Sequence, residues 1–155
     1  MKTAPEILTM LNDRLIEEHA AAVQYRSHAA MCKNWGYFKL ADYLNTRANQ
    51  ELEHAAELQD RILYLGGNVS GLTNDVVLAE TVTETFTLDK ESELTAIAGY
   101  IEGIQLACEH KDYGTRRLLE HILEEEETHL NDIETNMSQI TQMGIECYLS
   151  VQVES

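Results

Sequence analysis

Apolar residues recur every three to four positions in four long segments of the chain, which is the spacing that lines one face of an α-helix. The predicted helices run from residue 5 toward 34, from about 38 to 65, from 81 to a turn at 112–115, and from that turn to 144. The single proline stands at position 5, so no interior proline interrupts a helix. The pattern therefore predicts an all-α protein.

Capping residues and glycines mark where these helices begin and end. The Thr-x-x-Glu spacing of a capping box occurs at residues 3–6 and again at 81–84, which predicts two helix starts. Glycines predict the turns that follow the first, second and fourth helices, at Gly36, Gly66-Gly67 and Gly144. Ile145, Leu149 and Val153 form an apolar stripe that predicts a short fifth helix and must be buried somewhere.

The lengths of the connections predict how the helices are arranged. Short turns join the first helix to the second and the third to the fourth, so each of these pairs is antiparallel. The middle connection holds about 15 residues and can extend about 50 Å, whereas a helix of about 28 residues is about 42 Å long. We therefore expect one domain over residues 1–155. It comprises an antiparallel four-helix bundle at 1–144, with one long crossover, and the short fifth helix at 145–153.

Charged residues interrupt the apolar faces of all four helices. The pattern Glu-x-x-His occurs twice, at Glu51/His54 and at Glu126/His129. Residues three apart lie on one side of a helix, so each pair can grip one metal ion. Single glutamates interrupt the first and third helices, at Glu18 and Glu93. Counted from the two short turns, all six residues fall near the middle of the bundle, within about one helical turn.

These six residues predict a centre for two metal ions. Four buried carboxylates repel one another unless cations neutralise them, and two divalent ions supply the required charge. Mixed histidine and carboxylate ligands suit iron, manganese or zinc. Two Fe(II) ions would deliver two electrons together to oxygen or peroxide. In the predicted arrangement, Glu18 and His54 are the terminal ligands of one ion, and Glu93 and His129 are those of the other. Glu51 and Glu126 bridge the two ions.

Other polar residues are expected to play lesser roles. Tyr25 lies on the inward face, two turns from Glu18. It is expected to be a core tyrosine hydrogen-bonded to a carboxylate, a hydrogen-bond or electron donor beside the metals, or both. Four histidines are expected at the surface or at an interface rather than among the ligands: His19, His28, His110 and His121. Five glutamates are expected to be solvated or to surround the ligands: Glu17, Glu53, Glu124, Glu125 and Glu127.

Composition narrows the class of protein. A net charge of −16 argues against nucleic acid as a partner. Cys32, Cys108 and Cys147 form no Cys-x-x-Cys pair, which excludes a rubredoxin-type module, and so sparse a count suits a reducing compartment. The start lacks a signal-like apolar core and no run of 18 apolar residues exists, so we expect a soluble cytoplasmic protein with no membrane partner.

The chain resembles the bacterioferritin family over nearly its whole length. The strings that carry the match are Gln24-Tyr25, His28, Met31, Lys33-Asn34-Trp35-Gly36, Glu51-x-x-His54-Ala55, Arg61-Ile62-Leu63, Asp112-Tyr113, Ile122-Leu123, Glu126-x-x-His129, Met143-Gly144 and Tyr148-Leu149. The resemblance implies a ferritin-like ferroxidase that binds two iron ions per subunit through the same six ligands. It also implies ferric mineral storage in a homo-oligomeric cage of 24 subunits, with the fifth helix around a four-fold axis.

Three positions depart from the family pattern. Leu52 stands where bacterioferritins have the methionine that ligates haem between two subunits, so haem is not expected. Thr46 and Gln50 replace the histidine and aspartate that bind an extra iron on the inner wall in some members. Asp132 replaces an aromatic electron donor on the fourth helix.

Alternative functions remain open at this level. A rubrerythrin-like di-iron peroxidase would use the same bundle, although the missing Cys-x-x-Cys module argues against it. A subunit that co-assembles with haem-binding bacterioferritin chains is the other alternative; intact ligands argue against a silent partner but not against mixed cages. A mini-ferritin of the starvation-protection type is disfavoured, because its metal site lies between subunits. The oxidant, the iron capacity and the electron donor for iron release stay open.

Overall fold

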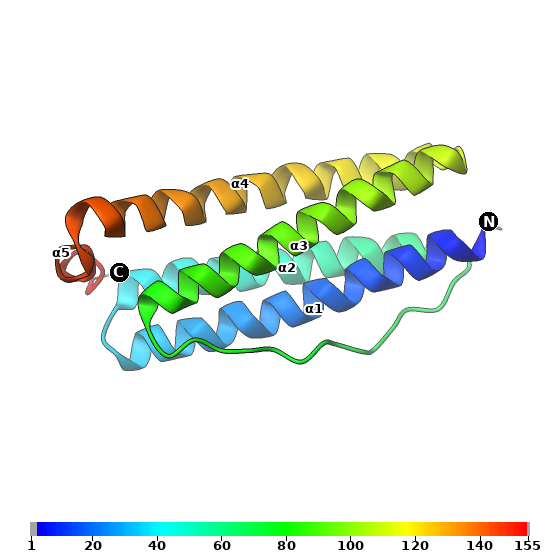
Figure 1. Ribbon diagram of the computed structural model, residues 1–155. Helices are drawn as coiled ribbons and strands as arrows, with labels where there is room; N and C mark the ends of the chain where they lie inside the picture. The colour runs from blue at the N-terminus through cyan, green and yellow to red at the C-terminus, as the bar shows by residue number, and fades with distance from the viewer. Residues whose placement is uncertain (1–2, 155) are drawn as a thin grey trace.

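Four long helices and one short helix make up the computed structural model, which describes residues 3–154 (Figure 1). The helices are α1 (Pro5–Asn34), α2 (Phe38–Tyr64), α3 (Val82–Glu109), α4 (Tyr113–Met143) and α5 (Ile145–Ser150). No strand occurs among the described residues. The all-α prediction and the four-helix bundle with a short fifth helix are therefore confirmed.

The crossover between α2 and α3 runs along α1 from one end of the bundle to the other (Figure 1). Asn12 fixes its start, because its side chain donates to the carbonyl of Asn68 at 3.0 Å and accepts from the N–H of Ser70 at 2.8 Å. The N–H of Ala79 fixes its end by donating to Nε2 of His28 at 3.1 Å. The helices α2 and α3 are parallel as a result, while α1–α2 and α3–α4 are antiparallel neighbours, as predicted.

One of the two predicted capping boxes is wrong. Thr81 is the N-cap of α3, and its hydroxyl accepts the N–H of Glu84 at 3.2 Å, as expected. The N-cap of α1 is Ala4 instead of Thr3, and no side chain caps it. Pro5 explains the shift, because it occupies the first helical position, where its missing N–H costs nothing.

The C-terminal helix is also shorter than predicted. It ends at Ser150, and the predicted apolar stripe stays partly exposed within this chain, with Ile145 at 36 % and Val153 at 46 %. The residue that α5 buries completely is Tyr148, whose hydroxyl donates to Asn136 on α4 at 2.6 Å. A left-handed Gly144 (φ 81°) turns the chain sharply from α4 into α5, which a residue with Cβ adopts only with strain.

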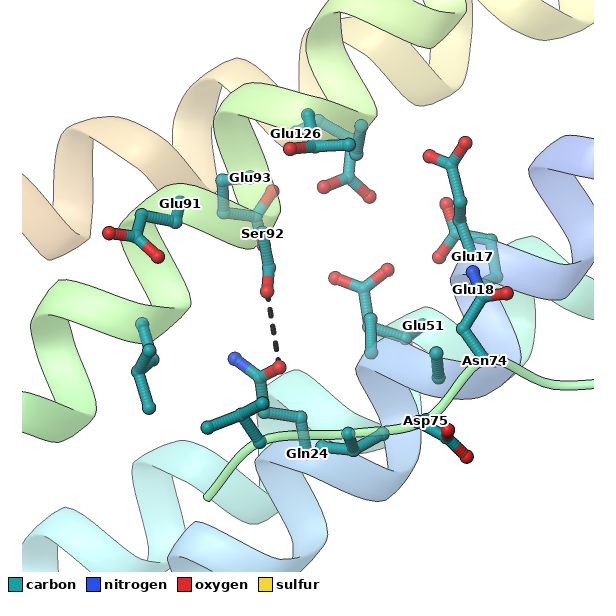
Figure 2. A pocket seen from close by; sticks show the side chains of 17 residues that line it. Glu17, Glu18, Gln24, Glu51, Asn74, Asp75, Glu91, Ser92, Glu93 and Glu126 are labelled. Atoms are coloured by element: carbon teal, nitrogen blue, oxygen red, sulfur yellow. Dashed lines mark hydrogen bonds between the residues drawn. The ribbon is translucent and has the colours of Figure 1, made fainter. Parts of the chain in front are cut away.

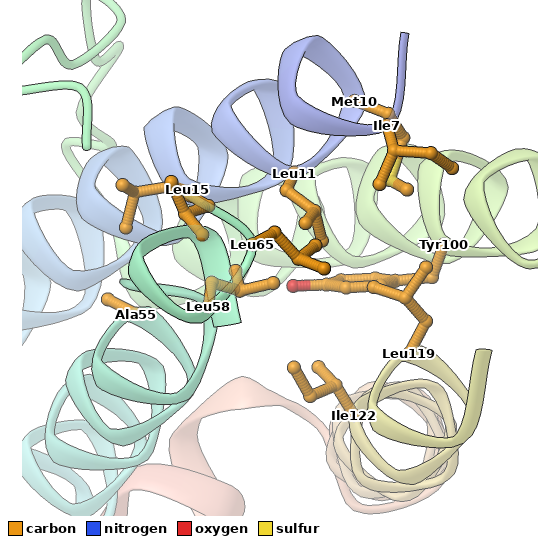
Figure 3. Close-up of a cluster of buried hydrophobic side chains, with 11 residues drawn as sticks. Ile7, Met10, Leu11, Leu15, Ala55, Leu58, Leu65, Tyr100, Leu119 and Ile122 are labelled. Atoms are coloured by element: carbon orange, nitrogen blue, oxygen red, sulfur yellow. The ribbon is translucent and has the colours of Figure 1, made fainter. Parts of the chain in front are cut away.

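Two apolar clusters fill the bundle, one toward each end. The first cluster, shown in Figure 3, packs around Tyr100 with residues of α1, α2 and α4 such as Leu11, Leu58 and Leu119. The second cluster includes Leu44, Phe86, Ile133 and Tyr148. Because these clusters hold the helices together on either side, the level between them can carry buried polar residues at fixed positions.

Candidate metal centre

All six predicted ligands lie in the middle of the bundle, and each is at most 2 % exposed. Every long helix contributes, because the inward face that the apolar period defines passes through these positions. The carboxylates from the four helices line one cavity, as Figure 2 shows. The residues and their helices are Glu18 of α1, Glu51 and His54 of α2, Glu93 of α3, and Glu126 and His129 of α4.

The six residues form two overlapping groups, each with the geometry to hold one metal ion. One group contains Glu18 and His54, the other contains Glu93 and His129, and both contain Glu51 and Glu126. Within each group the candidate ligand atoms lie within 4.8 Å of one another. The two glutamates that both groups contain are the two that the sequence analysis expected to bridge the ions.

Both histidines turn the same ring nitrogen toward the carboxylates. Nδ1 of His54 is 2.9 Å from Oε1 of Glu126 and 3.5 Å from Oε2 of Glu18. Nδ1 of His129 is 3.3 Å from Oε1 of Glu51. The two rings stack with their centroids 6.0 Å apart, so they flank one shared space.

Several buried polar atoms of the site have no hydrogen-bond partner among the described residues. Burying such an atom costs free energy unless a new partner replaces the water that it has lost. A metal ion can be that partner for anionic oxygens and for a neutral imidazole nitrogen. The donor set therefore fits divalent cations such as Fe(II). The atoms are Oε2 of Glu18, Oε1 of Glu51, Oε2 of Glu93, Oε1 of Glu126 and Nδ1 of His129.

Burial and mutual contact separate the pKa values of the four carboxyls. Burial raises the pKa of Glu18 well above its usual range, and that of Glu93 to about 8. Burial would also raise the pKa of Glu51, but its close contacts with Glu18 and the two histidines lower it to about 2. Burial would raise the pKa of Glu126 too, but its contacts with Glu93 and the two histidines together outweigh burial and lower it. These directions favour negative charge on the shared glutamates and protons on the terminal glutamates.

The pKa shifts of the two histidines favour positive charge beside the shared glutamates. Burial opposes a charged imidazole, but the neighbouring carboxylates outweigh it, and the pKa of His129 rises to about 10. The pKa of His54 is raised further, chiefly by Glu126 and Glu18. Without metal, protons on the histidines and terminal glutamates therefore neutralise the site, and cations must displace them.

Each terminal glutamate is held by a tyrosine from a neighbouring helix. Tyr25 donates to Oε1 of Glu93 at 2.6 Å, which confirms the predicted bond to a carboxylate. Tyr100 donates to Oε1 of Glu18 at 2.5 Å, a role that the sequence interpretation missed. A signal was present, because Tyr100 follows Glu93 by seven residues, as Tyr25 follows Glu18 by seven.

A second buried polar network lies beside the site and corrects one prediction. His28 was expected at the surface or an interface but is fully buried, with Nδ1 3.0 Å from Oδ1 of Asp89. Gln24 donates to the same oxygen at 2.8 Å and accepts from Ser92 at 3.1 Å. Because Nε2 of His28 accepts the N–H of Ala79, this network ties the crossover to α1 and α3.

The polar residues around the two histidines come from α2 and α4. Glu125, expected to surround the ligands, contacts Nε2 of His54 at 2.6 Å. Arg47 was not predicted to matter, yet it is 7 % exposed and bonds to Gln50 at 2.7 Å and to Asp132 at 3.1 Å. Its positive charge lowers the pKa of His129, against the stronger pull of the carboxylates.

A cavity of about 350 Å³ connects the glutamates of the site with the surface between α1, α3 and the crossover (Figure 2). Away from the centre its lining includes apolar residues and four acidic or polar ones: Glu17, Asn74, Asp75 and Glu91. One oxygen of Glu17 pairs with Arg14, and the other is buried without a hydrogen-bond partner among the described residues. Such a lining attracts cations toward the centre.

The fold and site together define a four-helix bundle with a buried carboxylate–histidine cluster that could hold metal ions. Residues 8–143 match the model of the ferritin-like domain, so the chain belongs to the ferritin-like family.

Relatives agree over nearly the full length. The chain is 36 % identical over 156 residues to bacterioferritin of Streptomyces coelicolor, covering 99 % of this chain and 93 % of the relative. It is 35 % identical over 154 residues to bacterial ferritin of Pseudomonas aeruginosa, covering 99 % and 100 %. It is 33 % identical over 150 residues to bacterioferritin of Mycobacterium avium, covering 96 % and 94 %. The resemblance predicted from the motifs is confirmed.

Within residues 3–154, none of the helices has both the length and the apolar character needed to cross a bilayer.

Proposed function

We propose that this protein is a ferroxidase that oxidises Fe(II) at a centre within each subunit and stores the ferric product. The observation that carries the proposal is the pair of overlapping groups that share Glu51 and Glu126. Two Fe(II) ions are the substrates, with Glu18 and His54 completing one position and Glu93 and His129 the other. The ions would thereby be held close enough to react as a pair.

Paired oxidation avoids one-electron products. Two Fe(II) ions lose one electron each, and one oxygen molecule takes both electrons with two protons, which yields two Fe(III) and one hydrogen peroxide. Alternatively, one hydrogen peroxide takes the two electrons with two protons and yields two water molecules. Tyr25 lies next to the centre, where it donates a hydrogen bond to Glu93 and would serve as an electron donor.

The surroundings favour delivery of a cation rather than an anion. The net charge is −16, and several carboxylates are among the residues that line the cavity leading inward. Relatives named bacterioferritin support storage of the ferric mineral inside a cage. We therefore propose a 24-subunit cage in the cytoplasm, built from this single-domain chain alone or mixed with a haem-binding subunit.

Substitution of the shared glutamates tests the proposal. Replacing a residue that hydrogen-bonds to a metal ligand typically lowers metal affinity or activity about ten- to a hundredfold. Loss of a bridging ligand should therefore lower activity by at least as much. Glu51→Ala and Glu126→Ala should each slow Fe(II) oxidation at least about tenfold. Glu124→Ala, an exposed neighbour on α4, is the matched control. Wild-type rates in both variants would overturn the assignment. If the protein reduced peroxide with an organic reductant but did not oxidise Fe(II), a peroxidase function would be favoured.

A further inference from the structure

The two metal positions differ in what lies behind each histidine. Nε2 of His54 is 2.6 Å from Oε2 of Glu125, while Nδ1 of the same ring faces the centre. The other oxygen of Glu125 is 3.1 Å from Nε2 of His121 on the preceding turn of α4. The ring of His54 is therefore held from both sides, by the centre and by an anionic partner.

The corresponding partner is missing on the other side. Glu125 directly precedes the shared glutamate of α4, and the residue that precedes the shared glutamate of α2 is the amide Gln50. The carbonyl of Gln50 is occupied by Arg47, which donates to it at 2.7 Å. Within residues 3–154, no carboxylate lies within ion-pair distance of Nε2 of His129.

This difference has a direct consequence for metal affinity. A carboxylate that accepts the N–H of a ligating histidine fixes the tautomer and orientation of the ring and makes the other nitrogen more basic. Loss of such a partner typically costs about ten- to a hundredfold in metal affinity. A guanidinium acts in the opposite direction, because its charge repels a nearby cation.

We propose that Glu125 positions His54 and makes the position that His54 shares with Glu18 the tighter of the two. The position of Glu93 and His129 is then the one that loses its metal ion first. The inference deepens the proposed function and rests on it only in one respect, namely that these residues bind divalent cations.

Variants that leave one position intact allow the two affinities to be measured separately. The double variant Glu93→Gln/His129→Gln keeps the His54 position, and Glu18→Gln/His54→Gln keeps the His129 position. Co(II) is the probe, with binding followed by its visible absorption and by calorimetry. The dissociation constant should be at least about tenfold lower for the His54 position.

Glu125→Gln is then added to both double variants. It should raise the dissociation constant about ten- to a hundredfold at the His54 position and shift the Co(II) absorption there. At the His129 position it should change the constant by less than about twofold. Gln50→Glu should have the opposite effect and lower the Co(II) dissociation constant only at the His129 position. Glu124→Gln removes the same charge from an exposed neighbour and should leave both constants unchanged.

Equal affinities in the two double variants would overturn the inference. An effect of Glu125→Gln that is the same at both positions, or no larger than that of Glu124→Gln, would overturn it as well. Two Co(II) ions with the expected dependence on Glu125, but no Fe(II) oxidation by the wild-type protein, would overturn only the proposed function. Failure of the wild-type protein to bind Co(II) at these residues would overturn both.

Discussion

Nδ1 of His54 on α2 lies 2.9 Å from Oε1 of Glu126 on α4, so a histidine of one motif contacts the glutamate of the other. The reverse contact joins His129 to Glu51 at 3.3 Å. The two Glu-x-x-His motifs are therefore interleaved instead of forming separate sites. A cation held by one motif must also contact a carboxylate of the other, which couples the two positions.

The metal-free protein should lose stability as the pH rises. Glu93 and His129 both hold protons more tightly in the folded state, with pKa values raised to about 8 and about 10. The contribution of Glu93 is complete below about pH 4.5 and is lost toward pH 8, and that of His129 is complete below about 6.5 and is lost toward 10. The melting temperature of the metal-free protein should thus fall between about pH 6 and 9.

A non-titrating variant provides the control for this pH dependence. Glu93→Gln keeps the size of the side chain but cannot release a proton, so its melting temperature should fall less steeply over the same range. Saturating Co(II) or Zn(II) should also flatten the wild-type profile, because the cations replace the protons. A wild-type melting temperature that is constant or rises over this range contradicts the protonation states assigned to the site.

Acidic residues at the outer end of the cavity should assist the entry of Fe(II). Asp75 and Glu91 line the cavity but belong to neither metal group. The variant Asp75→Asn/Glu91→Gln should raise the half-saturating Fe(II) concentration about two- to fivefold at low ionic strength and leave the maximal rate unchanged. The difference should shrink as salt screens the charges. Glu102→Gln, exposed on α3 outside the cavity, is the control; an equal effect there would exclude a local role.

Leu52 should decide whether haem binds. Its side chain is 48 % exposed and lines a surface hollow with Val23, which is 49 % exposed. Leucine has no atom that ligates iron, whereas a methionine of similar volume does. The purified protein should lack haem, and Leu52→Met should bind supplied haem with a bis-Met absorption spectrum. Leu63→Met, exposed elsewhere on α2, should not. About one haem per two subunits in the unmodified protein would contradict this interpretation.

The C-terminal segment 145–153 should stabilise the assembly through its exposed apolar residues. Ile145 and Val153 are 36 % and 46 % exposed within one chain. Replacing both with asparagine should weaken the cage, seen as smaller species by size exclusion, with the subunit fold retained by circular dichroism. Tyr148→Phe removes the bond to Asn136 and should lower the melting temperature without changing the assembly. An unchanged, equally heat-stable cage in the asparagine variant would exclude this role for the C-terminal segment.

Much of the fold could be predicted because the apolar period determines which residues face inward. Glu18 and Glu93 were recognisable as site residues because a charge within an apolar stripe is costly unless something compensates it. Residues that act through tertiary contacts left weaker signals. The pairing of His28 with Asp89 and the contact of Arg47 with Asp132 join residues more than 60 positions apart, which helical spacing does not reveal.

Boundaries were predicted less well where two local rules competed. Thr3 has the spacing of a cap, but Pro5 fits the first helical position better when Ala4 is the cap. The final helix stops at Ser150, before its apolar stripe is complete. A helix this short depends on tertiary contacts, here those of Tyr148, more than on its own sequence pattern.

Anomalous diffraction from crystals loaded anaerobically with Fe(II) would test the central claim most directly. The account predicts two iron peaks per subunit, about 3.5–4 Å apart, both between Glu51 and Glu126. One peak should adjoin His54 and the other His129. A single peak, or iron bound only away from these residues, would contradict a paired centre bridged by the two shared glutamates.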